Sequence, residues 1–288
     1  MLALSDIHNN LVAVRRLRAT EKNSFNAIVV AGDLGNETAK ETLRTLSTFN
    51  CPVLYVFGNW DSELEYKRAL VPGCRLIHQN VVTIDGWHFT GFSGCPTKWG
   101  NNPIALEHRA DKFSEILKRN REILSNTIAD KKLNLHRTVV VSHERLTRLD
   151  AIAPGVRLHI HGHIHSPSVT TMKQSTIVNV SVLDKPMTVR PQRLHQWDRK
   201  DFRNINNGNY TIFEMSNEKI DTKFVSFKNK YRSWVTVREE RHNGIEWIPE
   251  ELKWVNPNDP PLLRYWVSNL TPTRSCPAAS TLRRRPRG

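Results

Sequence analysis

The sequence lacks the features that mark several classes of protein. It has no run of about 18 or more apolar residues, so we expect no membrane-spanning helix and no membrane partner. Its four cysteines show no CxxC spacing, which favours reduced thiols over a zinc ribbon or a disulfide framework. The first residues, MLALSDIHNN, have neither the basic start nor the long apolar run of a secretory signal, so we expect a cytoplasmic protein.

Acidic residues are outnumbered by basic ones. The chain holds 42 Lys and Arg residues against 28 Asp and Glu residues, which gives a formal net charge of +14. The excess is spread along the chain and is densest in the segment RRRPR close to the last residue. Spread positive charge favours anionic partners in general, and it does not by itself indicate nucleic acid.

Apolar runs alternate with helical patterns in the first part of the chain. The runs LALS (2–5), AIVVAGD and PVLYVFGN (52–59) indicate buried strands, and residues 10–20 and 37–48 carry helical spacing between them. Continuous apolar strands that alternate with amphipathic helices indicate an α/β fold with both faces of the sheet covered. The expected helices therefore lie outside the expected strands.

Later segments extend this pattern and then end it. We predict a hairpin over 81–92 with Asp85-Gly86 as its turn, a helix over 109–129, and strands over 137–144, 156–165, 175–183 and 209–227. The domain organisation that we predict is a main domain over 1–228, a Trp-rich extension over 229–270 and a disordered basic tail over 271–288.

Polar side chains follow the ends of the predicted strands. The segment LHIHGHIH places histidines at every second position, which is either an exposed turn or a set of ligands. Asp6 and Asp33 could instead cap the helices that follow them. Because ligands bind at the carboxyl edge of such a sheet, we expect these residues to converge there. They are Asp6, His8, Asp33, Asn59, Asp61, His143, His163 and His165.

The donor atoms of this set suit a transition metal. Carboxylate, imidazole and amide oxygen together favour Mn²⁺, Fe, Zn²⁺ or Ni²⁺ over a thiolate-seeking ion or an all-oxygen calcium site. Two ions about 3.5–4 Å apart can share a carboxylate and a water, and the pKa of that water falls far below its value in bulk. We expect two divalent ions, with Mn²⁺ as the first choice.

The motifs DxH, GD, GNxD, a single His and GHxH follow one another here in the order that is typical of one family. The sequence resembles the calcineurin-like metallophosphoesterase superfamily over about residues 2–227. The resemblance implies a four-layer α/β/β/α sandwich with a C-terminal extension, and a dinuclear metal site bridged by Asp33. The implied ligands are Asp6, His8, Asp33 and His165 for one ion, and Asn59, His143 and His163 for the other, with Asp33 shared. His159 and His161 are then strand or outer-contact residues, and His161 is the better candidate for an outer contact.

The third motif departs from the pattern of many family members. In those members a His that protonates the leaving oxygen follows the Asn, whereas Trp60 stands at this position here. An indole has no proton to give, and a general acid is worth about 10²–10⁴-fold in rate. Asn59 and Asp61 remain as candidate catalytic residues, and Trp60 is a candidate substrate contact that could stack on a base or sugar, or could simply pack on its own loop.

Three hypotheses about function follow. The first is a metal-dependent phosphoesterase that uses a metal-bridging hydroxide, with a preference for phosphodiesters or activated esters, acting on a small phosphoester or nucleotide. The second is a nuclease or nucleic-acid binder, which the basic composition suggests. The third is a non-catalytic scaffold, although a scaffold tends to lose metal ligands and this chain has kept all seven.

Overall fold

The computed structural model describes nine parts of the chain. They are residues 1–65, 68–95, 113–146, 148–165, 167–180, 182–183, 209–227, 232–241 and 244–254, the last two through their backbone alone. The predicted start of the long helix at 109–112 and the predicted tail lie outside the described residues. Within the described part, no helix combines the length and apolarity needed to cross a membrane.

The first sheet has six strands in the order β12-β11-β1-β2-β3-β4. Strands β1 to β4 run parallel to one another, and β11 pairs antiparallel with both β1 and β12. The bounds are β1 Leu2–Leu4, β2 Ile28–Ala31, β3 Val53–Val56, β4 Cys74–Leu76, β11 Asn209–Met215 and β12 Ile220–Ser226.

The second sheet also has six strands, in the order β5-β6-β7-β8-β10-β9. Its central strands β6, β7, β8 and β10 are parallel, and β5 and β9 pair antiparallel at the two edges. The bounds are β5 Val82–Ile84, β6 Trp87–Phe92, β7 Thr138–Ser142, β8 Leu158–His161, β9 Ser168–Met172 and β10 Ser175–Asn179.

Alternating strand residues build the layers of the molecule. In β1, Leu2 and Leu4 join a core cluster with the helices α1 (Leu11–Thr20) and α2 (Ala39–Ser47), whereas Ala3 joins a cluster between the two sheets. In β7, Val139 and Val141 face that central cluster, and Val140 faces the helical side. Because successive strand side chains point to opposite faces, these clusters place one sheet on the other.

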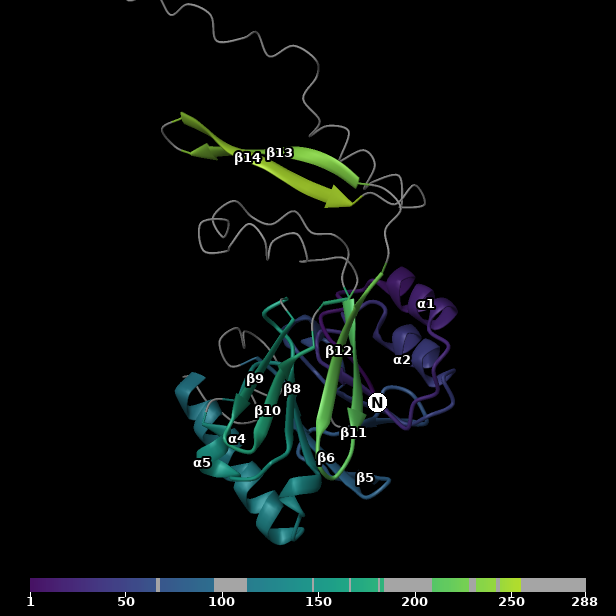
Figure 1. The fold of residues 1–288 in the computed structure, drawn as a ribbon, viewed down its shortest axis with the longest axis vertical. Coiled ribbons are helices and arrows are strands. Elements are labelled where there is room, and N and C mark those ends of the chain that lie inside the picture. Colours follow the sequence, from purple (N-terminus) through teal and green to yellow (C-terminus); the bar gives the residue numbers. More distant parts are fainter. Residues whose placement is uncertain are drawn as a thin grey trace, which may run out of the picture. The chain divides into compact units, whose positions relative to one another are not determined.

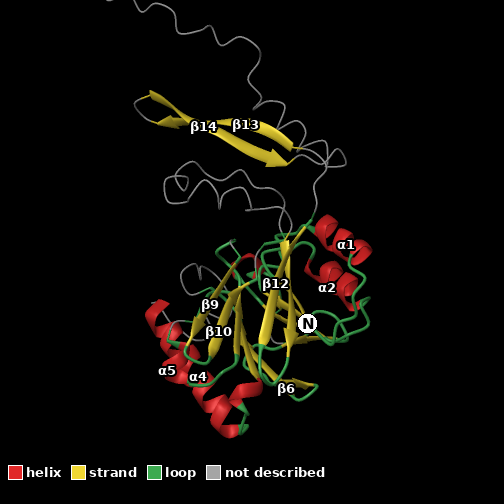
Figure 2. Ribbon diagram, viewed as in Figure 1, coloured by secondary structure: helices red, strands yellow, loops and turns green. Residues whose placement is uncertain are grey.

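Helices cover the outer face of each sheet. Figure 1 shows α1 and α2 on one flank, and α4 (Phe113–Asp130) with α5 (Leu149–Ile152) on the opposite flank. Leu124 of α4 and Leu149 of α5 pack in the same buried cluster as Val140. Figure 2 shows the two groups of helices with the strands between them. The expected four-layer α/β/β/α sandwich is thus confirmed.

The predicted helices and hairpin appear with small differences at their ends. The hairpin turns at Asp85 and Gly86, both with positive φ, as the sequence predicts. Helix α2 begins at Ala39, two residues after the predicted start, because Asn9 Oδ1 accepts hydrogen bonds from the backbone N–H groups of Glu37 and Thr38. Those two residues form the entry to the helix.

A hairpin lies in the Trp-rich extension, where the sequence analysis assigned no strands. Strands β13 (Arg232–Arg241) and β14 (Gly244–Trp254) pair antiparallel, with a register shift between Val235 and Val237. The backbone divides into two compact units, of which the first ends at Phe227 and the second contains this hairpin. The sheets described above all belong to the first unit.

Candidate metal centre

Five loops at the carboxyl ends of parallel strands supply the polar side chains. The strands are β1, β2 and β3 of the first sheet and β7 and β8 of the second. This edge is where open α/β sheets bind ligands. The structure brings together the residues that the motifs singled out, and it adds several neighbours that the sequence analysis did not select.

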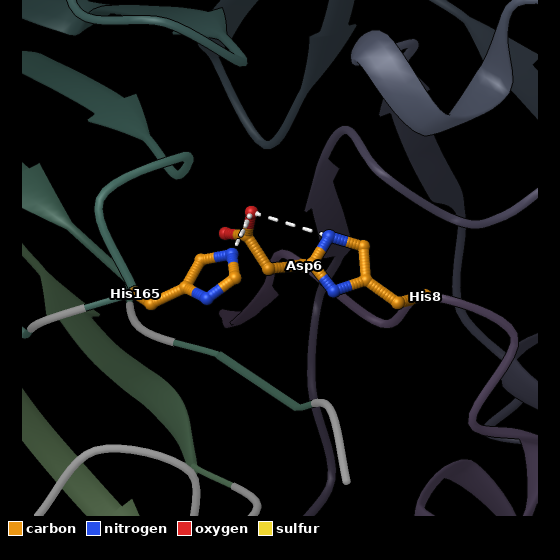
Figure 3. Close-up of side chains that lie close together, drawn as sticks. All are labelled: Asp6, His8 and His165. Carbon is orange, nitrogen blue, oxygen red and sulfur yellow. Dashed lines mark ion pairs between the residues drawn. The ribbon is translucent and has the colours of Figure 1, made fainter. Parts of the chain in front are cut away.

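Asp6 lies between two histidines, as Figure 3 shows. Its Oδ1 is 3.2 Å from His165 Nε2 and 3.9 Å from His8 Nε2. The backbone N–H of His163 donates to the same carboxylate, at 3.0 Å from Oδ2, and Ser5 Oγ donates to Oδ2 at 2.6 Å. Burial opposes the charge of Asp6, but the contact with His165 and the nearby imidazoles hold the pKa of Asp6 below its usual value.

Asp33 joins the two halves of the cluster. Its Oδ2 is 3.0 Å from His8 Nε2 and 3.2 Å from His143 Nε2, and its Oδ1 accepts the backbone N–H of Trp60 at 2.8 Å. Burial alone would raise the pKa of Asp33, but His143 and His8 hold it well below its usual range. One carboxylate oxygen therefore contacts a histidine from each of the two expected ligand sets.

His143 has one ring nitrogen that lies between two acceptor oxygens. Its Nδ1 is 2.9 Å from the carbonyl oxygen of Ala31, which only accepts, so Nδ1 carries a proton. Its Nε2 is 3.1 Å from Asn59 Oδ1 and 3.2 Å from Asp33 Oδ2. Nε2 and these two oxygens would repel one another, so a proton on Nε2 or a metal ion must lie among them. Burial disfavours the protonated ring, but the charge of Asp33 raises the pKa of His143 to about 9.

Three groups of donors in the described part of the chain have the spacing of metal ligands. Asp6, His8 and His165 form one of these groups, and Asp6, Asp33 and His143 form another; a third contains Cys95, Glu144 and His163. Within each group the ligand atoms lie within 4.8 Å of one another. Buried carboxylate and imidazole donors in this arrangement fit a divalent transition metal.

Backbone conformation at these positions is unusual. Non-glycine residues with positive φ are uncommon, and each costs of order 1–3 kcal/mol unless its surroundings hold it. Such residues gather at binding and catalytic sites because the cost is offset there by the contacts of the site. Among the expected ligands, those with positive φ are Asp6, His8, Asp33, His163 and His165.

Two glycines let the ligand loops approach one another. A Cβ atom on Gly58 would collide with Asp33 Oδ1, and one on Gly162 would collide with Ser5 Oγ and approach Asp6 Oδ2 at 2.6 Å. The glycines of the GNxD and GHxH motifs therefore have a steric role here. His161 acts beside them, because its Nδ1 and the amide of Asn179 both contact the carbonyl oxygen of Gly162. His161 thus contacts the residue that directly precedes the expected ligand His163.

Neither aspartate caps a helix, so the capping alternative is wrong. The side chain of Asn10 caps α1 by accepting from the N–H of Ala13, and α2 has no side-chain cap at Thr38. The carboxylates of Asp6 and Asp33 are instead turned toward histidines, as described above.

Trp60 and Asp61 occupy different environments within one short 3-10 helix, η1 (Asn59–Asp61). The indole of Trp60 is 47% exposed and lies against the ring of His8, with centroids 4.5 Å apart. Asp61 is buried, and its two carboxylate oxygens accept the backbone N–H groups of Gly35 and Gly58 at 2.8 Å. Burial, and then the charge of Asp33, raise the pKa of Asp61 to about 6. These contacts tie the GD and GN loops together.

The sequence analysis missed Cys95 and Glu144. Cys95 Sγ is 3.5 Å from Glu144 Oε2 and 3.7 Å from His163 Nε2, and the ring of His163 lies edge-on to His143 at 5.2 Å between centroids. Glu144 directly follows His143 in the sequence, which could have drawn attention to it. Cys95 has no such signal, because it stands alone after its strand.

The fold and this set of side chains define an α/β sandwich with a candidate metal site at the strand ends. The chain belongs to the calcineurin-like phosphoesterase superfamily, whose domain model matches residues 1–194. The resemblance seen in the five motifs is thereby confirmed. A search of curated proteins found no match.

The chain is similar to solved structures of proteins with different descriptions, and three of them are the following. A conserved uncharacterized protein from Streptococcus pneumoniae TIGR4, a predicted phosphoesterase, shares 14% identity over 78% of this chain and 87% of its own, with a TM-score of 0.40. Phosphopantetheinyl hydrolase from Mycobacterium tuberculosis shares 20% identity over 63% and 88%, with a TM-score of 0.36. Vacuolar Protein Sorting 29 from Cryptosporidium parvum shares 12% over 88% and 97%, with a TM-score of 0.37.

Proposed function

We propose that this protein is a metal-dependent phosphoesterase that hydrolyses phosphodiesters or phosphate esters with good leaving groups. The observation that carries this proposal is the convergence of Asp33 Oδ2, Asn59 Oδ1 and His143 Nε2 on one point. A cation satisfies all three atoms at once. Membership of the calcineurin-like phosphoesterase superfamily supports the proposed reaction class.

The residues that would hold two divalent cations are those of the two expected sets. Asp6, His8 and His165 would hold one ion, Asn59, His143 and His163 the other, and Asp33 would contact both. Two cations bound there would neutralise charge on the phosphate oxygens and supply a water of lowered pKa as the nucleophile. Mn²⁺ is the ion that we expect, with Fe, Zn²⁺ or Ni²⁺ as alternatives.

The remaining groups of the site position these ligands. Ala31 fixes the tautomer of His143, the N–H of Trp60 fixes Asp33, and Asp61 holds the loops of Gly35 and Gly58. Outer contacts of this kind orient ligand side chains, so we assign Asp61 a positioning role. Asn59 contacts His143 through the oxygen that would also face a cation.

The preference for good leaving groups follows from Trp60. Its exposed indole stands beside His8 and has no proton to donate to a leaving oxygen. An alkoxide would have to leave unprotonated, whereas a nitrophenolate or a diester with an acidic leaving alcohol needs less help. The same indole face is available to stack on an aromatic leaving group or a base.

Hydrolysis of bis-p-nitrophenyl phosphate tests the proposal. Removal of metal with a chelator should abolish the activity, and added Mn²⁺ should restore it. Asp33→Asn should lose nearly all of its rate, whereas Asp130→Asn, at the exposed end of α4, should keep the rate of the unmodified protein. Activity that survives chelation would exclude a metal-dependent reaction, and a purified protein that takes up no transition metal would favour the scaffold.

A further inference from the structure

Three neighbouring strands of the second sheet each end in a potential metal ligand outside the Asp6 and Asp33 groups. Cys95 follows β6, Glu144 follows β7 and His163 follows β8. Strands β6, β7 and β8 are parallel neighbours, so their carboxyl ends and the loops after them lie side by side. The fold therefore brings a thiol, a carboxylate and an imidazole to one place.

The donor atoms have the spacing of ligands around one ion. Cys95 Sγ is 3.5 Å from Glu144 Oε2 and 3.7 Å from His163 Nε2, and the three ligand atoms all lie within 4.8 Å of one another. In tetrahedral zinc, bonds of about 2.3 Å to sulfur and about 2.0–2.2 Å to nitrogen or oxygen place the ligand atoms about 3.6 Å apart. The two sulfur distances match this value.

Burial and access also fit such a site. Cys95 is only 1% exposed, whereas Glu144 and His163 are partly exposed, so an ion could enter from the side of the imidazole and carboxylate. Three protein ligands would leave a fourth position for water or an anion. The competing explanation is a neutral thiol that donates a hydrogen bond to Glu144.

We propose that Cys95, Glu144 and His163 form a thiolate-containing Zn²⁺ site beside the phosphoesterase centre. On binding, the S–H bond of Cys95 breaks, its proton leaves to water and the sulfur forms a bond to zinc. A thiolate ligand favours zinc over manganese more strongly than carboxylate and imidazole ligands do. The two ring nitrogens of His163 lie 3.7 and 3.8 Å from Cys95 Sγ. A neutral imidazole offers one lone pair to a metal, so an ion at Cys95 would take His163 in place of the centre that contains His143.

The absorption spectrum of the Co²⁺-loaded full-length protein tests this site. Co²⁺ takes the place of zinc, and a thiolate ligand to it gives an intense charge-transfer band in the near ultraviolet that nitrogen and oxygen ligands do not give. We expect the band in the unmodified protein, and its loss on addition of Zn²⁺ but not of Mn²⁺. A Co²⁺-loaded protein without the band would overturn the proposal and establish the neutral thiol.

Matched cysteine variants assign the band to one residue. Cys95→Ser should lose the band and about one bound zinc per chain, whereas Cys51→Ser, which removes a half-buried thiol packed on the cluster of α1 and α2, should keep both. Glu144→Gln should keep a weaker band, with Co²⁺ affinity lowered by at least about tenfold. A band that persists in Cys95→Ser would contradict the assignment.

The proposed zinc site and the proposed hydrolysis can be tested independently of each other. Mn²⁺-restored hydrolysis without a thiolate band would support the enzyme and exclude this site. A thiolate band in a protein that hydrolyses no phosphoester would support this site and exclude the enzyme.

Discussion

Trp60, whose ring contacts that of His8, limits the proton-transfer chemistry that is possible at its position. The indole lies 4.5 Å from the imidazole, and its own backbone N–H holds Asp33. Any residue except proline can make this backbone contact, so the side chain can vary without loss of the hydrogen bond to Asp33. The identity of this one side chain therefore decides whether a proton donor stands beside His8.

Replacement of Trp60 tests this interpretation. Trp60→His should raise kcat/KM for an alkyl phosphate relative to p-nitrophenyl phosphate, because an imidazole can protonate the poor leaving group; general acids are worth about 10²–10⁴-fold, and we expect the lower end. Trp60→Ala is the control, since it removes the indole without adding a donor. Steady-state kinetics on both substrates measure the ratio, and an equal ratio in all three proteins would argue against a missing general acid.

His143 makes the stability of the metal-free protein depend on pH. Its pKa is raised from 6.5 to about 9, chiefly by the charge of Asp33 acting against burial. The folded state thus binds the proton more tightly, so its stabilising contribution is full below about pH 6.5 and is lost as pH rises through about 9, by at most about 3 kcal/mol. Denaturant unfolding in chelator across this range should show the loss.

Two variants and added Mn²⁺ test whether this pH dependence comes from His143. His143→Gln should flatten the pH dependence between pH 6.5 and 9, whereas His136→Gln, an exposed position in the short helix η3 (Leu135–Arg137), should keep it. Saturating Mn²⁺ should also flatten it, because the ion takes the place of the proton and binding releases that proton. A slope that His143→Gln leaves intact would assign the titration to another group.

Strand ends are the elements that the sequence predicts best. Buried parallel strands are continuous apolar runs, so β2, β3 and β7 stand out, and the first polar residue after each run falls at the functional edge. That is why the ligand loops could be predicted from motifs alone. The approach of Cys95 to His163 could not, because it depends on β6, β7 and β8 being neighbours in the second sheet.

The hairpin β13–β14 was missed for a different reason. Its register shifts between Val235 and Val237, so two-residue alternation does not run through the strand, and charged residues interrupt any apolar run. Strand prediction from a sequence relies on that alternation. The position of the strands in this segment thus becomes visible only in the pairing of the backbone.

Close approach of β1 and β8 can be tested through Gly162. A Cβ there would overlap Ser5 Oγ and crowd Asp6, so Gly162→Ala should displace the loop that carries His163 and His165 and lower kcat/KM by about 10²-fold. Gly73→Ala is the matched control, because its Cβ would meet open space while its positive φ costs about 1–2 kcal/mol. We expect Gly73→Ala to lower stability and leave the rate unchanged; equal rates in both variants would contradict the steric role.

At the scale of the whole molecule, the net charge of +14 leaves nucleic acid as a predicted partner. The densest basic segment belongs to the tail beyond the described residues, so the structure does not bear on it. Contacts with phosphates release counterions, so nucleic-acid binding should weaken steeply with salt, and removal of residues 271–288 should flatten that dependence. Binding measured over a range of salt concentrations checks this, and a flat dependence in the full chain would argue against the partner.

At the scale of the whole molecule, we also predict how much of the chain is needed for folding. The family model ends at residue 194, but β11 pairs directly with β1 and buries Tyr210 and Phe213 in the two core clusters of the first sheet. Each such side chain is worth about 1.5–3 kcal/mol, and a domain of this size has only about 5–15 kcal/mol to lose. A chain of residues 1–208 should therefore fail to fold.

A chain of residues 1–228 keeps β11 and β12 and should retain both the fold and the Mn²⁺-dependent hydrolysis of the full protein. Circular dichroism, thermal unfolding and diester hydrolysis on the two truncated chains and the full chain measure this. If the chain of residues 1–228 folds but loses activity, the second unit contributes to catalysis. If it does not fold, the boundary after β12 is wrong. A folded and active chain of residues 1–208 would show that the pairing of β11 with β1 is dispensable, which the burial of Phe213 at 1% exposure argues against.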